Sequence, residues 1–212
     1  MKLTQKLMIG AVAAVLSFTS FAGNEFKIIS AAAEKGNAVA QLKLGEFYFH
    51  GENVGKNYIK AMEWYEKAAD QGNAEAMCNL GVCYQYGFGA KINDENLKLA
   101  EKWYRKAAEK GYARAQYHLA NYLENRKIDD KIKDQKERDA IAAKYREEAF
   151  PWYKKAAEGG YALAQYKLGR FYEQKNNKEE AAKWYKKAAD QGNAHALARL
   201  IVLGKPFEAP AK

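Results

Sequence analysis

Residues 36–48 read GNAVAQLKLGEFY, and residues 64–72 read WYEKAADQG. These two stretches recur as the opening and the closing of one unit, which is written four times in the chain. Repetition at a period of roughly 20 to 50 residues is typical of stacked structural repeats. Such stacks build binding surfaces more often than catalytic pockets. The openings lie at 36–48, 72–84, 111–123 and 160–172, and the closings at 64–72, 103–111, 152–160 and 184–192.

All variation in unit length falls between two constant halves. Each opening glycine is followed by a leucine eight residues later, and each tryptophan stands eight residues before the next glycine. In the first half, Ala40, Leu44 and Phe47 recur at helical spacing and form one apolar face. The second half repeats its apolar positions at i, i+3 and i+7, so it is also expected to be a helix. Two helices joined by a loop of variable length therefore explain the pattern.

The sequence thus predicts an all-α solenoid of helix pairs over residues 23–203. The residue after each conserved leucine is small, which lets the paired helix approach closely. Each opening glycine is expected to end the preceding helix as a left-handed cap. The full repeats are predicted at 36–71, 72–110, 111–159 and 160–191, with half-repeats at both ends.

Residues 1–22 have the pattern of a secretory signal peptide. Lys2 and Lys6 precede an apolar run at 7–18, and small residues lead to a cleavage site after Ala22. The apolar run is too short to span a membrane, although an anchor that is never cut is the alternative. We expect an exported protein, periplasmic or secreted, with no integral membrane segment after cleavage.

The composition favours helix and argues against nucleic acid as a partner. The 212 residues carry 35 Lys and Arg against 26 Asp and Glu, for a net charge of +9, but the lysines are scattered at fixed positions of the repeat. A regular scatter indicates solvated helix faces, and export makes a nucleic-acid partner less plausible still. After the signal segment Ser30 is the only serine, there is no threonine, and prolines are few.

The third unit contains a charged insertion at 124–148, in which sixteen of twenty-five residues are charged, eight of each sign. Lys144 and Glu148 in it are spaced to pair on a helix surface. The pattern predicts a loop followed by a long exposed extension of the second helix, kinked at Pro151. Both a solvated insertion and a partner-binding arm fit this composition. The tail at 204–212 is expected to be disordered.

The repeated G-x-A-x-A-x-x-x-L-G-x-x-Y opening, the loop glycine Gly51 and the K-A-x-x-W-Y-x-K-A-A-x-x-G closing resemble the Sel1-like repeat, a relative of the tetratricopeptide repeat. The resemblance covers about residues 28–203. It implies a right-handed solenoid of α/α pairs and a role as an adaptor or scaffold in protein assemblies. The third and fourth units lack the loop glycine, so their inter-helix turns are expected to differ.

Some cysteine-rich members of this family are penicillin-binding proteins or β-lactamases, which makes a hydrolase the alternative function. Serine chemistry of that type needs an S-x-x-K motif, but Ser30 is followed by three alanines. His50, His118 and His195 lie in different units without metal-ligand spacing, so we predict neither a metal nor a cofactor. Five residues of helix separate two cysteines by more than disulfide reach, so we interpret Cys78 and Cys83 as buried thiols, with a bond open only if the helix breaks.

The predicted binding surface is the face of the first helices that the core positions leave free. In tetratricopeptide-like solenoids these helices line the concave surface. The C-terminal part of this stripe is basic and rich in amides, which suits an acidic peptide or a carboxylate terminus. A solvated face without a partner and a glycan or small-molecule site are the alternatives. The predicted partner-binding residues are Lys43, Asn79, His118, Asn121, Lys167, Arg170 and Arg199.

Overall fold

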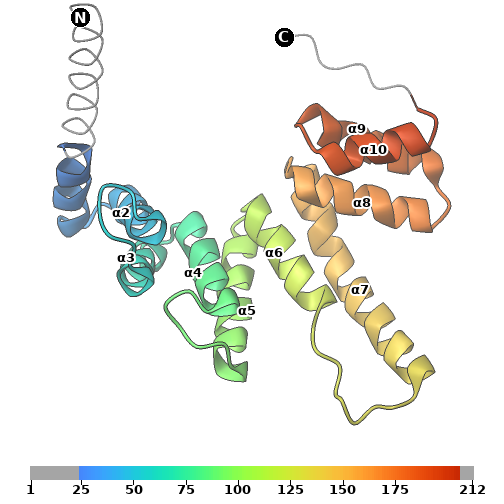
Figure 1. Ribbon diagram of the computed structural model, residues 1–212, viewed down its shortest axis with the longest axis horizontal. Helices are drawn as coiled ribbons and strands as arrows, with labels where there is room; N and C mark the ends of the chain where they lie inside the picture. The colour runs from blue at the N-terminus through green and yellow to red at the C-terminus, as the bar shows by residue number, and fades with distance from the viewer. Residues whose placement is uncertain (1–23, 206–212) are drawn as a thin grey trace, which may run out of the picture. The chain divides into compact units, whose positions relative to one another are not determined.

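A computed structural model describes residues 24–205, and every regular element in this range is an α-helix (Figure 1). The all-α prediction is confirmed for this part of the chain. The predicted signal peptide at 1–22 and residues 206–212 of the predicted tail lie outside the described residues. After a helix at 24–34, the helices are α2 (Ala38–His50), α3 (Tyr58–Asp70), α4 (Ala74–Tyr86), α5 (Asp94–Glu109), α6 (Ala113–Glu124), α7 (Gln135–Glu158), α8 (Ala162–Gln174), α9 (Lys178–Asp190) and α10 (Ala194–Val202).

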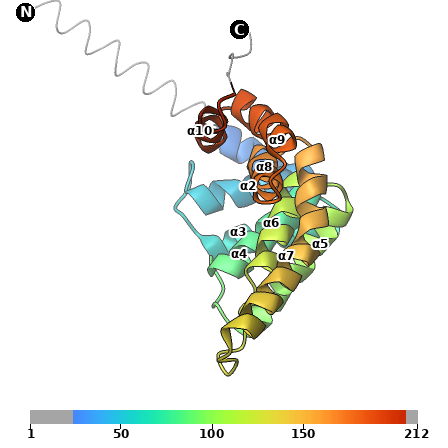
Figure 2. The same ribbon diagram turned by 90° about the vertical axis from the view of Figure 1, so that its right-hand side faces the viewer.

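The chain divides into two compact structural units, each of which holds more than one sequence repeat. The first unit ends at Ala100 and the second unit begins at Glu101. In the first unit α3 packs against both α2 and α4. In the second unit each helix from α6 to α10 packs against the next one, and Figure 2 shows α8, α9 and α10 grouped together. Adjacent antiparallel helices of this kind are what a repeated helix–loop–helix sequence builds.

The opening glycines end the preceding helices, as predicted. Because they adopt positive φ, a side chain at any of these positions would strain the backbone. In three openings the next residue is an asparagine whose Oδ1 accepts a hydrogen bond from the backbone N–H three residues on, at 2.9 Å in each case. The φ angles are 91° at Gly36, 89° at Gly72, 83° at Gly111, 87° at Gly160 and 84° at Gly192.

The turns between paired helices differ between the four repeats, which confirms the expectation from the missing loop glycine. Helix α2 ends at Gly51 with φ of 79°, and α4 ends at Gly87 with φ of 75°. Helix α6 instead ends at Asn125 with φ of −103°, and α8 ends at Lys175 with φ of −81°. The first two turns thus use a left-handed glycine, whereas in the turn after α8 the left-handed residue is Asn176, with φ of 58°. The described turn after α6 contains no residue with positive φ.

The tyrosine of each W-Y dipeptide, more than the tryptophan, fills the space between paired helices. A Cβ added to Gly45 would lie 2.5 Å from the Tyr65 ring, and one added to Gly169 would lie 2.6 Å from the Tyr185 ring. Both rings are at most 2% exposed. The small residue after the leucine therefore permits close approach, as expected, and the tyrosine ring takes the vacated space.

The four tryptophans differ in burial. Trp184 is 9% exposed, but Trp64, Trp103 and Trp152 are only half-buried. Each of the four tryptophans has over its ring the ammonium group of the lysine three residues on, between 3.8 Å (over Trp64) and 4.6 Å (over Trp152) from the ring centroid. Two adjacent residues of a helix point about 100° apart, so both cannot face the partner helix. The core therefore contains the tyrosine of each W-Y dipeptide and, among the tryptophans, Trp184.

A set of buried glutamines joins successive helix pairs, and the sequence analysis missed it. Gln41, Gln116 and Gln165 are at most 7% exposed. The Nε2 of each donates to the backbone carbonyl of the residue eight positions earlier, near the end of the preceding helix, at 3.1 to 3.2 Å. Each of these carbonyls also accepts a backbone hydrogen bond from the opening glycine three residues on, at 3.0 to 3.1 Å, so the amide adds a second donor at the helix end. The A-x-A-Q sequence of three openings is the signal that would have identified them.

The charged insertion forms a loop and then the 24-residue helix α7, as expected, and the helix continues through Pro151. The pairing within it differs from the prediction. Glu148 does not pair with Lys144 but accepts a hydrogen bond from Arg126 at 2.9 Å, and Arg126 also lies 3.2 Å from Glu101. Residues at the two ends of the insertion are thus tied to each other and to α5 by ion pairs.

Candidate functional site

Two of the predicted partner-binding residues lie in the first unit, where one forms an ion pair and the other is nearly buried. Lys43 on α2 pairs with Glu46, with Nζ 3.3 Å from the carboxylate. Asn79 on α4 is only 9% exposed, although the sequence analysis expected it on an exposed groove. The reason is that its neighbours Cys78 and Leu80 are also fully buried, so α4 is covered around most of its circumference.

The two cysteines behave as the sequence analysis expected. Cys78 and Cys83 are both reduced thiols, not joined by a disulfide, and have no exposed surface. Burial raises the pKa of Cys83 to about 12, which keeps the thiol protonated and unreactive near neutral pH. Among residues 24–205, no three side chains of His, Cys, Asp or Glu are placed to share a metal ion. Nor does any helix in that range combine the length and apolarity needed to cross a bilayer.

His118 and Asn121 on α6 are engaged within the second unit. The His118 ring stacks on Tyr104 with centroids 5.4 Å apart and planes 8° from parallel. Burial, and secondarily the charge of Arg114, lower the pKa of His118 to about 4, so the imidazole is neutral near pH 7. The Oδ1 of Asn121 accepts a hydrogen bond of 2.8 Å from Asn125. Both residues contribute more to the local structure than to a free binding surface.

Lys167 on α8 belongs to a partly buried polar triad. Its Nζ donates to Oε2 of Glu124 at 3.1 Å, and the hydroxyl of Tyr153 donates to the same oxygen at 2.7 Å. Burial and then this hydrogen bond raise the pKa of Tyr153 well above its usual value, so the hydroxyl remains a donor. The charge of Lys167 is therefore largely offset by Glu124.

Arg199 on α10 is also paired. Its Nε donates to Glu173 at 3.2 Å, and its Nη2 makes a closer contact with the same carboxylate. Tyr185 donates its hydroxyl to Glu173 at 2.6 Å. The hydrogen bond from Arg199 is the main reason that the pKa of Glu173 lies below its usual value. Arg199 thus joins α10 to α8, and little of its charge is left for a partner.

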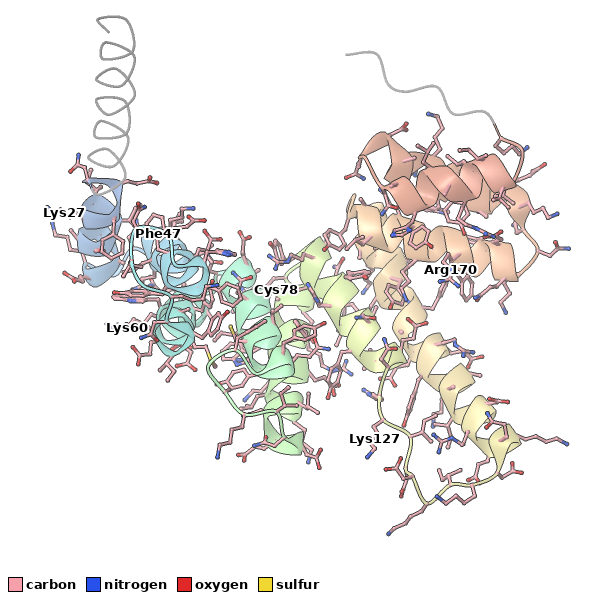
Figure 3. The ribbon with its side chains drawn as sticks, viewed as in Figure 1. Lys27, Phe47, Lys60, Cys78, Lys127 and Arg170 are labelled. Atoms are coloured by element: carbon pink, nitrogen blue, oxygen red, sulfur yellow. The ribbon has the colours of Figure 1, made fainter. Side chains whose placement is uncertain are left out.

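Arg170 differs from the other predicted cations because it is exposed and forms no ion pair with any carboxylate of residues 24–205. Figure 3 shows it on α8 with its side chain at the surface. It lines two hollows of the second unit. One is a pocket of about 110 Å³ between α7 and α8, and the other is an open depression of about 370 Å³ beside Arg199. Gln174, one turn further along α8, also lines both hollows.

The structure therefore brings together Lys167, Arg170 and Arg199 on neighbouring helices of the second unit. It adds residues that sequence reasoning missed. Arg146 and Phe150 line the pocket from α7, although the insertion was identified only as a charged segment. The repeat does not mark these two residues, because the positions six and two residues before the tryptophan hold different residue types in the four repeats.

Comparison with solved structures agrees with this architecture. A Sel1 repeat protein from Oxalobacter formigenes matches with a TM-score of 0.70 and 30% sequence identity, over 84% of this chain and 68% of that chain. An immunity protein from Pseudomonas aeruginosa matches with a TM-score of 0.55 and 26% identity, over 82% of this chain and 60% of that chain.

Two curated relatives are similar over a shorter stretch. The component HRD3A of an ERAD-associated E3 ubiquitin-protein ligase from Arabidopsis thaliana is 40% identical over 58 residues, which is 27% of this chain and 9% of HRD3A. Protein sel-1 homolog 2 from Mus musculus is 41% identical over 59 residues, again 27% of this chain and 9% of the relative. This chain thus matches less than a tenth of the length of these relatives.

The family model for the Sel1 repeat matches residues 38–73, 74–112, 146–161 and 162–193. Together these segments make up more than half of the chain, and they fall on the helix pairs described above. The segment missing from the third match is most of the charged insertion with helix α6 before it. The chain therefore belongs to the Sel1 repeat family.

Proposed function

We propose that this protein is an exported, non-catalytic scaffold that binds another protein through a surface of its second unit. That surface is the exposed face of the first helices of the pairs, here α8 and α10. Sel1 repeats generally mediate interactions between proteins, and the relative HRD3A is named as a component of a ligase assembly. The observation that carries the proposal is the position of Arg170, an exposed guanidinium without an ion pair that lines two adjoining hollows. No observation favours the hydrolase alternative.

The charge of this face suggests the chemistry of the partner. A guanidinium binds a carboxylate through two parallel hydrogen bonds, which gives both affinity and orientation. Lys167 and Arg199 are already paired with Glu124 and Glu173. Arg170 is therefore the predicted contact for an acidic group of the partner, and the two paired cations shape the surface beside it.

Site-specific crosslinking in the cell that produces the protein tests this proposal. A photo-crosslinking amino acid replaces Gln174 in one variant and Lys144, an exposed residue of α7 away from the hollows, in another. We expect a crosslinked partner from position 174 and none from position 144. Adding Arg170→Glu to the first variant should abolish that product. Equal crosslinking from both positions, or a product that survives Arg170→Glu, would refute the proposed surface.

The choice of Arg170 for this test follows from the ion pairs. Reversing the charge of Lys167 or Arg199 would place two carboxylates within hydrogen-bond distance of each other, so a loss of binding would not be distinguishable from misfolding. Arg170 forms no hydrogen bond or ion pair with a carboxylate of residues 24–205, although its charge helps to lower the pKa of Glu173. Its reversal should leave thermal stability nearly unchanged, since exposed substitutions away from special contacts usually change stability by no more than about 0.5 kcal/mol.

Export is the second part of the proposal and has its own test. The basic start, the apolar run at 7–18 and the small residues before position 23 support it. Mass spectrometry of the protein from its natural source should find a mature chain beginning at Gly23, in the periplasm or the medium. A chain that keeps residues 1–22 in the cytoplasm would rule out export.

A further inference from the structure

The pocket of about 110 Å³ between α7 and α8 has an apolar base and a charged rim. Phe150 from α7 and Phe171 from α8, with ring centroids 4.1 Å apart, form the apolar part of its lining together with Leu168, which is 1% exposed. Arg146 and Arg170, both exposed, stand at the rim. A small apolar depression bordered by two cations is suited to a ligand that has both an apolar group and a negative charge.

The volume limits what the pocket accepts. Whole small-molecule ligands occupy sites of roughly 300 to 1,000 Å³, and a cavity of about 150 Å³ is known to hold a benzene molecule. At about 110 Å³ the pocket is smaller than either. It therefore fits a single aliphatic side chain, such as leucine, isoleucine or methionine, better than an aromatic ring.

The ion pairs determine the charge at the rim. Glu124 also lines the pocket, but it accepts hydrogen bonds from Lys167 and Tyr153, and the charge of Lys167 offsets its own. Neither Arg146 nor Arg170 pairs with a carboxylate of residues 24–205. The rim is thus left with two positive charges, which attract an anionic group of a ligand.

We propose that this pocket binds one aliphatic side chain of a partner peptide, while a carboxylate on the next residue of that peptide pairs with Arg146 and Arg170. The proposal rests on the proposed function, since it assigns a recognition element to the same face of α8. It goes further by predicting that the partner is recognised through an aliphatic residue adjacent to Asp or Glu.

Binding of blocked synthetic peptides to the full chain tests the proposal. The probe is acetyl-Gly-Gly-Leu-Glu-Gly-Gly-amide, whose blocked ends carry no charge. Replacing its leucine by alanine or by tryptophan should each weaken binding by about tenfold, because alanine leaves the pocket unfilled and tryptophan does not enter it. Replacing its glutamate by glutamine should weaken binding up to about fivefold, the range for exposed ion pairs. NMR signals of the arginine Nε–H groups report binding directly.

Protein variants locate the interaction. Arg170→Gln should weaken binding of the glutamate peptide and leave binding of the glutamine peptide unchanged, which is the signature of a direct pair in a double-mutant cycle. Lys144→Gln is the matched control, since it removes the same charge from α7 at a position about 200° around the helix from Arg146. Phe171→Leu should reduce the discrimination between leucine and tryptophan in the peptide.

Several outcomes would overturn the assignment. Equal losses for Arg170→Gln and Lys144→Gln would indicate non-specific attraction by a basic protein, and equal binding of leucine and tryptophan peptides would mean that no pocket is filled. A gain in peptide affinity on removing residues 206–212 would identify the chain's own tail as the occupant. If crosslinking from Gln174 still depends on Arg170 while the peptides show none of these dependences, the proposed function stands and the pocket assignment fails.

Discussion

Adding one methyl group at Gly45 tests how the two helices of a pair pack together. In Gly45→Ala the new Cβ would lie 2.5 Å from Cε1 of Tyr65, whose ring is 2% exposed and has no room to move aside. The substitution gains about 0.5–1 kcal/mol from the better helix propensity of alanine. Overpacking of a dense core costs about 1–3 kcal/mol. The expected net loss of stability is about 1–2 kcal/mol. A larger loss is not expected, because the third repeat has Ala120 at the equivalent position.

Urea unfolding followed by tryptophan fluorescence and circular dichroism measures this loss. Gly55→Ala is the matched control in the same unit, because a Cβ there has open space around it. We expect the control to stay within about 0.5 kcal/mol of the parent. A Gly45→Ala variant as stable as the control would show that Tyr65 does not need the space left by the glycine.

Three further predictions concern the second unit. Gln165→Ala removes two hydrogen bonds, one donated to the Ala157 carbonyl and one accepted from Gln191, and should cost about 1–3 kcal/mol in urea unfolding. The exposed Gln174→Ala should cost almost nothing, and equal effects would contradict the role of the buried amide. Asn193→Ala removes the cap of α10 and should cost about 1 kcal/mol, seen as a lower urea midpoint; an unchanged midpoint would mean the cap is dispensable. His118 should make the protein less stable as the pH falls from its unfolded pKa of about 6.5 to its folded pKa of about 4, because the unfolded chain takes up the proton first. A His118→Gln variant should lack that pH dependence, and a curve parallel to the parent would contradict the pKa shift.

The periodic part of the fold was predictable because the repeat states it four times. The register of glycine and leucine located both helices of each pair and the left-handed caps, such as Gly192 with φ of 84°. The same register placed Lys167, Arg170 and Arg199 on one surface. These predictions depend only on helical spacing, which a single sequence contains in full.

The interactions between helices were not predictable in the same way. The pairs of Lys167 with Glu124 and of Arg199 with Glu173 join residues 43 and 26 positions apart, and no sequence period links them. The burial of Gln165 was not predicted. A polar side chain is assumed to be exposed unless a hydrogen-bond partner for it is known, and the sequence does not reveal that partner. The apolar part of the pocket lining includes Phe150, which lies in the third repeat, the one whose length departs most from the others.

The dissociation constant of the Arg170→Glu variant for the partner identified by crosslinking is the decisive measurement for the proposed surface. The claim is that the face of α8 in the second unit binds another protein through Arg170. We expect at least about tenfold weaker binding for Arg170→Glu, because charge reversal replaces an attraction by a repulsion. We expect unchanged binding for Lys144→Glu. Equal affinities of the two variants would contradict the claim, and the binding surface would then have to be sought elsewhere on the chain.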